Sequence, residues 1–328
     1  MGRHREDKRL DIADLAMLVT VVIWAANNII VKRALGQIDP RAYVFGRFAI
    51  VVVPLFAWLL YRRVPMAIRR DDVLLFCFTG ITGYAAYNLL FTIALDHTTA
   101  FSTALLVSLG PVITLLFAAS IGSERIRSVQ WIGVACSTAG VALFVGEKLA
   151  GGTPVLGDAL SLIGAVCFSA YSLATLPLVR RYGSPVVTAW SALIGLVLSL
   201  PITLPAVVDQ NWGTVDLSGW ASLVYSSIMS MLVAYTIWGW AIERRGVGRT
   251  VPYMYLIPIL AGVFSVWVFD ESFGLLKLFG GALVLVGVAI ARRSRSLPAG
   301  QPAPDWQPQP SLQRPQSPLL EEVDILPL

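Results

Sequence analysis

The chain alternates between long apolar runs and short polar segments. A transmembrane α-helix needs about 20 predominantly apolar residues, and ten runs approach that length. The pattern therefore predicts an all-α polytopic membrane protein with ten transmembrane helices, five in each half of the chain. The ten expected helices are about Ile12–Val31, Ala42–Tyr61, Val73–Ala94, Ala100–Ala119, Val129–Val145, Val155–Val179, Val186–Pro205, Gly219–Ile242, Thr250–Val268 and Gly274–Ala291.

The second half of the chain repeats a pattern found in the first. Pro111, Glu124, Gly133 and Gly140 recur as Pro258, Glu271, Gly280 and Gly287, always 147 residues later. Unusual residues held in register over an apolar background indicate an internal duplication. We therefore divide the chain into an N-terminal segment (1–11), a first repeat (12–146), a second repeat (155–293) and a C-terminal tail (294–328). In a membrane protein, two such halves favour a transporter.

The basic residues predict how the chain is oriented. With the N-terminus inside, 18 Lys and Arg fall in cytoplasmic segments and 5 in outer segments. Cytoplasmic loops carry the excess of basic residues, so we expect a multi-pass protein of the cell membrane with both termini cytoplasmic. Five helices is an odd number, so the second repeat must enter the membrane upside down. Glu124 is accordingly expected inside and Glu271 outside, in an inverted repeat.

Composition narrows the function further. The chain is 56% hydrophobic and 14% charged, with a mean hydropathy of +0.70, whereas soluble domains carry roughly 25% charged residues. The net charge of +5 is spread over separate loops, so we expect no nucleic-acid partner. The three cysteines lack metal-site spacing, and no phosphate-binding loop is recognisable. We therefore expect no metal and no cofactor.

The two ends of the chain differ from the rest. Residues 1–11 are polar and basic and precede a run of spanning length, which is longer than the apolar core of a signal peptide. The tail contains eight prolines among Gln and Ser residues. Such a segment buries too little apolar surface to offset the entropy of ordering, so we predict a disordered cytoplasmic tail.

The motifs are similar to those of a known family. The chain carries Trp24-Ala25-Ala26-Asn27, Phe45-Gly46-Arg47-Phe48 and Phe168-Ser169-Ala170-Tyr171, and each half closes on its Pro, Glu and two Gly. From about Asp11 to Arg293 it resembles EamA-type members of the drug/metabolite transporter superfamily. The resemblance implies export, less often uptake, of small organic metabolites, amino acids among them. Where the family couples transport, the partner would be a proton or another ion.

Polar and aromatic residues inside the apolar runs suggest a solute site. Tyr and Trp offer an apolar face with one polar tip, and buried amides need partners. We expect a cavity between the two halves, walled by the first, third, fourth, sixth, eighth and ninth helices. For each residue taken alone, a role in helix packing or in an interfacial belt is the stronger alternative. The candidate residues are Asn27, Tyr87, Asn88, Ser108, Tyr171, Tyr235, Trp238 and Tyr255.

Two prolines and one arginine are also singled out. Pro111 and Pro258 lack an N–H and are expected to kink the fourth and ninth helices, facing either protein or a wet cavity. Arg47 is the one clear charge inside a run. It lies about six residues from the outer end of its helix, so snorkelling or structural pairing is favoured over binding a substrate carboxylate.

The remaining features concern packing and coupling. The glycine pairs lie two turns apart and are expected to let a neighbouring helix approach closely, whereas Leu59 is expected to face outward. No Asp or Glu falls near the middle of an expected span. A mid-membrane carboxylate is common in proton-coupled transport, so facilitated diffusion fits the residues equally well. A membrane enzyme would need a catalytic cluster at membrane depth, which the sequence lacks; a non-transporting receptor is the less favoured alternative.

Overall fold

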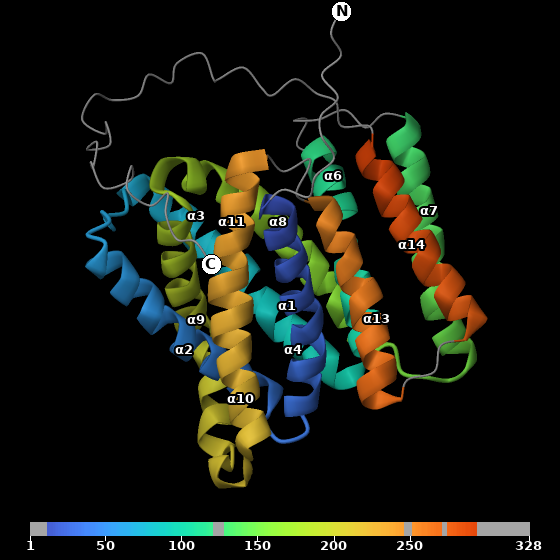
Figure 1. The fold of residues 1–328 in the computed structure, drawn as a ribbon, viewed down its shortest axis with the longest axis horizontal. Coiled ribbons are helices and arrows are strands. Elements are labelled where there is room, and N and C mark those ends of the chain that lie inside the picture. Colours follow the sequence, from blue (N-terminus) through green and yellow to red (C-terminus); the bar gives the residue numbers. More distant parts are fainter. Residues whose placement is uncertain (1–11, 121–127, 246–250, 271–273, 294–328) are drawn as a thin grey trace, which may run out of the picture. The chain divides into compact units, whose positions relative to one another are not determined.

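A computed structural model describes residues 12–120, 128–245, 251–270 and 274–293. Every regular element in these ranges is helical, and the long helices lie side by side in a bundle (Figure 1). Eight helices are long and apolar enough to cross a membrane, and two shorter apolar helices bring the described total to ten. The segments 1–11 and 294–328, and the residues Glu124 and Glu271, lie outside the described residues.

The helices follow the expected order, with ends shifted by a few residues. The first repeat contains α1 (Ile12–Ala34), α2 (Pro40–Tyr61), α3 (Val73–Thr79), α4 (Tyr87–His97), α5 (Ala100–Val107), α6 (Gly110–Ser120) and α7 (Ser128–Ala150). The second repeat contains α8 (Leu156–Tyr182), α9 (Ser184–Asp209), α10 (Leu217–Tyr225), α11 (Ala234–Arg245), α13 (Leu256–Phe269) and α14 (Leu275–Arg293). Three of the expected helices, the third, fourth and eighth, are therefore each built from two α-helical pieces.

Two of these composite helices contain a wide turn. A π-helical segment, Gly80–Ala86, joins α3 to α4, and a second, Ser226–Val233, joins α10 to α11. The two segments lie at corresponding places in the two repeats, 146 to 147 residues apart. A π-helical turn shifts the backbone hydrogen bonds by one residue and frequently marks a functional site.

The two prolines lie at helix starts, which corrects the expectation of kinks inside continuous helices. The fourth helix is broken between α5 and α6, and Pro111 is the second residue of α6. In the ninth, a 3₁₀ turn (Val251–Tyr255) precedes α13, and Pro258 lies in the first turn of α13. Proline is tolerated in a first turn because the N–H it lacks would have no intrahelical partner there.

The glycine faces pack against each other, as expected. A Cβ on Gly133 would lie 2.6 Å from the carbonyl oxygen of Gly287, and one on Gly140 would lie 2.7 Å from that of Gly280. The earlier glycine of α7 therefore faces the later glycine of α14, so the two helices are antiparallel neighbours (Figure 1). Equivalent helices that run in opposite directions are what an inverted repeat requires.

The other helix contacts also join one repeat to the other, in pairs that correspond between the repeats. In the first repeat α4 packs against α8, and in the second α11 packs against α1. The Gly80–Ala86 segment likewise packs against α9, whereas the Ser226–Val233 segment packs against α2. Helices of the two repeats are thus interleaved rather than separated into two lobes.

The exterior is apolar over much of the bundle. Trp131, Val197 and Phe279 are each more than half exposed, which suits a surface that contacts lipid tails. Polar groups gather toward the helix ends, as for Asp216, which caps the start of α10. Hydrogen bonds from Ser218, the Gly219 N–H and Gln37 lower the pKa of Asp216 to about 2.

Candidate functional site

An aromatic cluster lies near the middle of the spanning helices and draws on both repeats. Trp24 of α1 packs against Tyr235 and Trp238 of α11, with ring centroids 5.6 and 5.4 Å apart. Phe168 and Tyr171 of α8 form a second group, in which Phe168 lies 4.9 Å from Tyr87 of α4. We call these six residues and Tyr84 the aromatic cluster; Tyr84 lies 5.8 Å from Tyr171.

In both π-helical segments, side-chain N–H groups donate hydrogen bonds to backbone carbonyls. Asn88 donates its amide hydrogens to the carbonyls of Tyr84 (3.0 Å) and Gly83 (3.3 Å). In the other repeat, the Trp24 indole donates to the carbonyl of Ser230 at 3.2 Å. An unpaired carbonyl in hydrocarbon is costly, so these contacts stabilise the wide turns where the aromatic cluster is formed.

Arg47 is enclosed by the protein, so of the two expected roles, snorkelling and structural pairing, the first is wrong. It lies seven residues into α2, about 10 Å from the start of that helix, and is 4% exposed. Its Nη1 donates to the Asn88 carbonyl oxygen across 3.4 Å, and its Nε is buried with no partner among the described residues. The phenols of Tyr87 and Tyr235 are close enough to act on its charge.

The two aromatic groups meet at a small void. Tyr84 and Tyr235 both line it, together with Val51, Leu55, Thr188, Ala192 and Met231. Its volume is about 10 Å³, which is room for roughly one water molecule. A solute can therefore occupy this position only after the surrounding helices move apart.

The structure brings five of the eight candidates together. Tyr87, Asn88, Tyr171, Tyr235 and Trp238 belong to or contact the aromatic cluster. Asn27 is buried, and its carbonyl oxygen has no partner among the described residues. Ser108 ends α5 and donates to the Leu105 carbonyl at 2.6 Å. Tyr255 packs against an apolar cluster that includes residues of α5, α6, α7 and α14.

Three members of the aromatic cluster were not among the candidates. Trp24 and Phe168 belong to two of the three short motifs on which the family resemblance rests. Tyr84 shares the spacing of Tyr87 and Asn88 and could have been included on that ground. A comparison of the two repeats could have identified Trp24 and Phe168. Trp24 lies in the first helix of the first repeat, and Phe168 lies in the first helix of the second.

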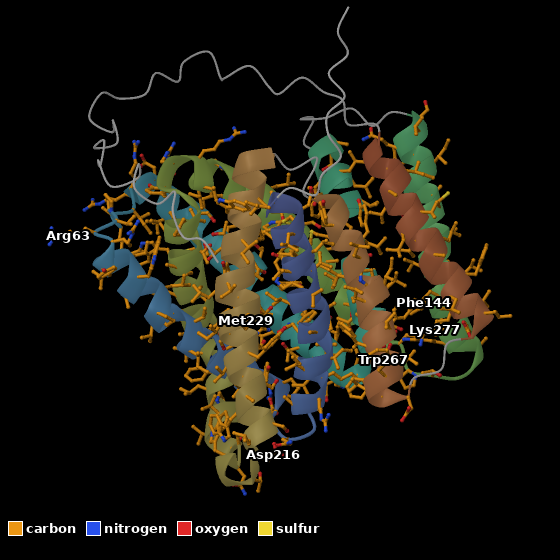
Figure 2. The ribbon with its side chains drawn as sticks, viewed as in Figure 1. Arg63, Phe144, Asp216, Met229, Trp267 and Lys277 are labelled. Atoms are coloured by element: carbon orange, nitrogen blue, oxygen red, sulfur yellow. The ribbon has the colours of Figure 1, made fainter. Side chains whose placement is uncertain are left out.

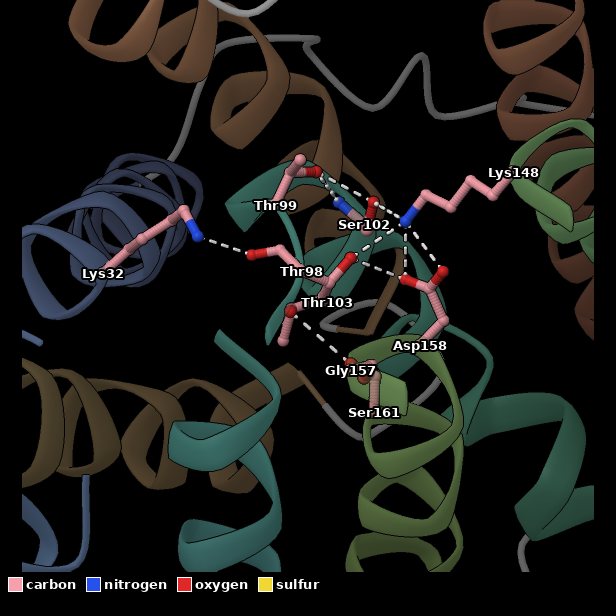
Figure 3. Close-up of polar contacts among 9 residues, drawn as sticks. All are labelled: Lys32, Thr98, Thr99, Ser102, Thr103, Lys148, Gly157, Asp158 and Ser161. Carbon is pink, nitrogen blue, oxygen red and sulfur yellow. Dashed lines mark hydrogen bonds and ion pairs between the residues drawn. The ribbon is translucent and has the colours of Figure 1, made fainter. Parts of the chain in front are cut away.

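A second polar group lies at the expected outer ends of α7 and α8 (Figure 3). Lys148 Nζ lies 2.7 and 2.8 Å from the two carboxylate oxygens of Asp158, which is 1% exposed. It also donates to the hydroxyls of Thr98 (2.9 Å) and Ser102 (3.1 Å). Thr98 in turn donates to Asp158 at 2.8 Å. This network ties α7, α8 and the start of α5 together.

The corresponding aspartate of the first repeat is also bonded. Asp14, 144 residues before Asp158, accepts a hydrogen bond from the Tyr253 hydroxyl, which belongs to the 3₁₀ turn before α13. Lys148 and Lys277 lie over the Phe144 ring, and Figure 2 places Lys277 beside Phe144 between α7 and α14. Each repeat therefore fastens its first helix through an aspartate in the first turn.

The sequence was compared with known protein families. The model of the EamA-like transporter family matches residues 11–146 and again residues 155–293. The chain belongs to this family. It is accordingly a multi-pass membrane transporter and not an enzyme. The two matches also coincide with the two repeats that the duplicated motif indicates.

Named relatives are similar over nearly their whole length. A probable terminal-alkyne amino-acid exporter of Streptantibioticus cattleyicolor is 30% identical over 87% of this chain and 95% of its own. A probable amino-acid metabolite efflux pump of Escherichia coli is 26% identical over 84% of this chain and 93% of its own. A protein of known crystal structure superposes with a TM-score of 0.61 at 23% identity, over 87% of this chain and 99% of its own, and shares the fold.

Proposed function

We propose that this EamA-like transporter exports a small amphipathic metabolite of the amino-acid class across the cell membrane. The observation that carries the proposal is the aromatic cluster, to which both repeats contribute at mid-span. Aromatic faces with polar tips suit a solute that has one apolar end and one polar end. The names of the two relatives, an amino-acid exporter and an amino-acid metabolite efflux pump, support the same class.

Alternating access is the mechanism that we propose. The void between Tyr84 and Tyr235 holds about 10 Å³, so the cluster must open toward one side at a time to admit a solute. The antiparallel contact of α7 and α14 supports an arrangement in which the two repeats exchange roles. The π-helical segments beside the cluster are weak points in the helical hydrogen bonding, and we place the bending there.

The orientation is proposed from the basic residues, with both termini in the cytoplasm. We expect single cysteines at Ser123 and Ser272, in an otherwise cysteine-free protein, to respond oppositely to an impermeant thiol reagent. Reagent added to intact cells should label Ser272→Cys and not Ser123→Cys. The two positions adjoin Glu124 and Glu271, which correspond between the repeats, and each variant serves as the control for the other. Equal labelling of both, or labelling of Ser123→Cys alone, contradicts the inverted arrangement.

The solute site is tested by transport into proteoliposomes. We expect the purified protein to exchange a labelled amino acid with a large apolar side chain. Trp238→Ala and Asn88→Ala should weaken transport by about 5- to 150-fold, because each loses an aromatic contact or hydrogen bond worth about 1–3 kcal/mol. The measurement is counterflow at several concentrations, which separates affinity from rate.

The control for this experiment needs a residue that faces lipid. Leu59, expected to face outward, is fully buried, because it packs in the apolar core around α2. Leu60 is 62% exposed on the same helix, so Leu60→Ala should leave transport unchanged. If Asn27, Asn88, Tyr235 and Trp238 can each be replaced by Ala with changes below about twofold, the solute site lies elsewhere.

A further inference from the structure

Arg47 is a buried cation that has no paired anion in the part of the chain that the structure describes. Arg47 is 4% exposed, and no carboxylate within the described residues forms an ion pair with its guanidinium. Its single hydrogen bond, to Asn88, is 3.4 Å long, and its Nε has no partner among those residues. A guanidinium carries five N–H donors in a planar fork. Most of this donor capacity is therefore unused.

Such an arrangement is costly unless a ligand completes it. A buried charge without a partner is strongly unfavourable, and an arginine in a membrane span normally faces protein or water and pairs with a neighbour. The groups around Arg47 do not neutralise it, because the neighbouring tyrosines (Tyr43, Tyr235 and Tyr87) and Asn88 are uncharged near neutral pH. The missing component is an anion that can accept two hydrogen bonds, and a carboxylate has that geometry.

Asn88 fixes the orientation of the Arg47 guanidinium. Its amide nitrogen is committed to the carbonyls of Gly83 and Tyr84, so its oxygen must face Arg47. The wide turn of Gly80–Ala86 thus supplies acceptors that orient Asn88, and Asn88 orients the guanidinium. Arg47 is therefore positioned by the π-helical segment at which we propose that the helix bends when the aromatic cluster opens.

The surroundings indicate where the rest of a ligand would lie. Val51, one turn after Arg47 on α2, lines the void, and so does Tyr235. Residues four apart share a helix face, so Arg47 lies on the side of α2 that faces the void. An apolar group attached to a carboxylate on Arg47 would extend along Tyr235 toward Trp24, whose rings pack at 5.6 Å.

We propose that the Arg47 guanidinium, positioned by Asn88, is the receptor for the carboxylate of the transported solute. This inference rests on the proposed function and narrows it to solutes with a free carboxylate and an adjacent apolar group. Amines and amides of the same shape are then poor ligands. Asn88 acts as a positioning residue, because it reaches the solute through Arg47.

The test compares ligands that differ only in the carboxylate. Large apolar L-amino acids, beginning with phenylalanine, are each paired with the corresponding amide, and binding to the purified full chain is measured by thermal shift. We expect the amino acid to raise the melting temperature of the wild type, because a ligand that binds only the folded state stabilises it. We expect the amide to bind about 10- to 100-fold more weakly, since charge-assisted hydrogen bonds are lost.

Three variants separate a ligand role from a structural role. Arg47→Met should be at least as stable as the wild type without ligand, because an uncompensated charge is removed, and should no longer distinguish acid from amide. Arg47→Lys keeps the charge but loses the planar fork; it should lose affinity for the acid about 10-fold and keep its weak affinity for the amide. The matched control is Arg62→Met, at the exposed end of α2, which should behave as the wild type.

Two results overturn the inference. One is a wild type that binds no carboxylate of the panel. The other is an Arg47→Lys variant that loses acid and amide binding equally, which would make Arg47 a structural residue. Failure of the proposed function looks different: the acid-dependent thermal shift would persist while no amino acid of the panel crosses the proteoliposome membrane.

Discussion

Replacing Lys148 with methionine is expected to destabilise the folded protein by about 3–5 kcal/mol, the cost of removing one partner of a buried ion pair. Asp158 is 1% exposed and would keep only its hydrogen bond from Thr98. The hydrogen bonds from Lys148 to Ser102 and Thr98 would be lost with the ammonium group. The measurement is the melting temperature and the midpoint of chemical unfolding in detergent.

The double variant shows whether the buried charge is the cause. Lys148→Met combined with Asp158→Asn removes both charges and should regain most of the lost stability, because no uncompensated carboxylate remains. Arg33→Met, which removes an exposed cation from the end of α1, serves as the control for net charge. A double variant as unstable as the single one contradicts the account, and the network would then act through packing alone.

Adding one methyl group at Gly140 is expected to disrupt the close contact between α7 and α14. A Cβ there would meet the Val284 nitrogen at 2.6 Å and the Gly280 carbonyl oxygen at 2.7 Å. Both are backbone atoms, so α7 and α14 must separate. Overpacking of this kind typically costs about 1–3 kcal/mol and occasionally more, and Gly140→Leu should prevent folding. Thermal unfolding and gel filtration in detergent measure the effect.

The same helix supplies the control. A Cβ on Gly146 would meet nothing within 4 Å, so Gly146→Ala should be neutral or slightly stabilising, because Ala favours the helix more than Gly does. Gly133→Ala should resemble Gly140→Ala, since its Cβ would lie 2.3 Å from the Ala291 nitrogen. Equal stability of the Gly140 and Gly146 variants would mean that the two helices are not in close contact.

The helices, and the glycine faces at which a neighbour approaches closely, could be predicted because hydropathy and small residues encode them directly. Ten apolar runs became ten helices, and the glycines at 133, 140, 280 and 287 lie at a close helix contact as expected, although the sequence did not name the partner helix. The register between Gly133 and Gly287 even reveals that the partners are antiparallel. These features depend on patterns that repeat along the chain and need no knowledge of distant contacts.

The details of the candidate site could not be predicted, because they depend on contacts between distant residues. A π-helical turn at Gly80–Ala86 leaves no trace in an apolar pattern, since it changes only which carbonyl each N–H meets. Leu59 and Arg47 both lie in α2, which is apolar on every face, so the sequence did not show which side was covered. Both residues are buried by helices that are close in space but distant in the sequence.

The contact between α7 and α14 also bears on how such a chain could have arisen. The same small-residue face occurs on both helices, with Gly133 against Gly287 and Gly140 against Gly280. A self-complementary face of this kind can close a two-fold dimer. An ancestral five-helix protein bearing it could therefore have paired with an upside-down copy of itself before its gene was duplicated and fused. Fusion would then have preserved the contact between α7 and α14 while the two copies diverged. Only one of them now carries an arginine at the position of Arg47.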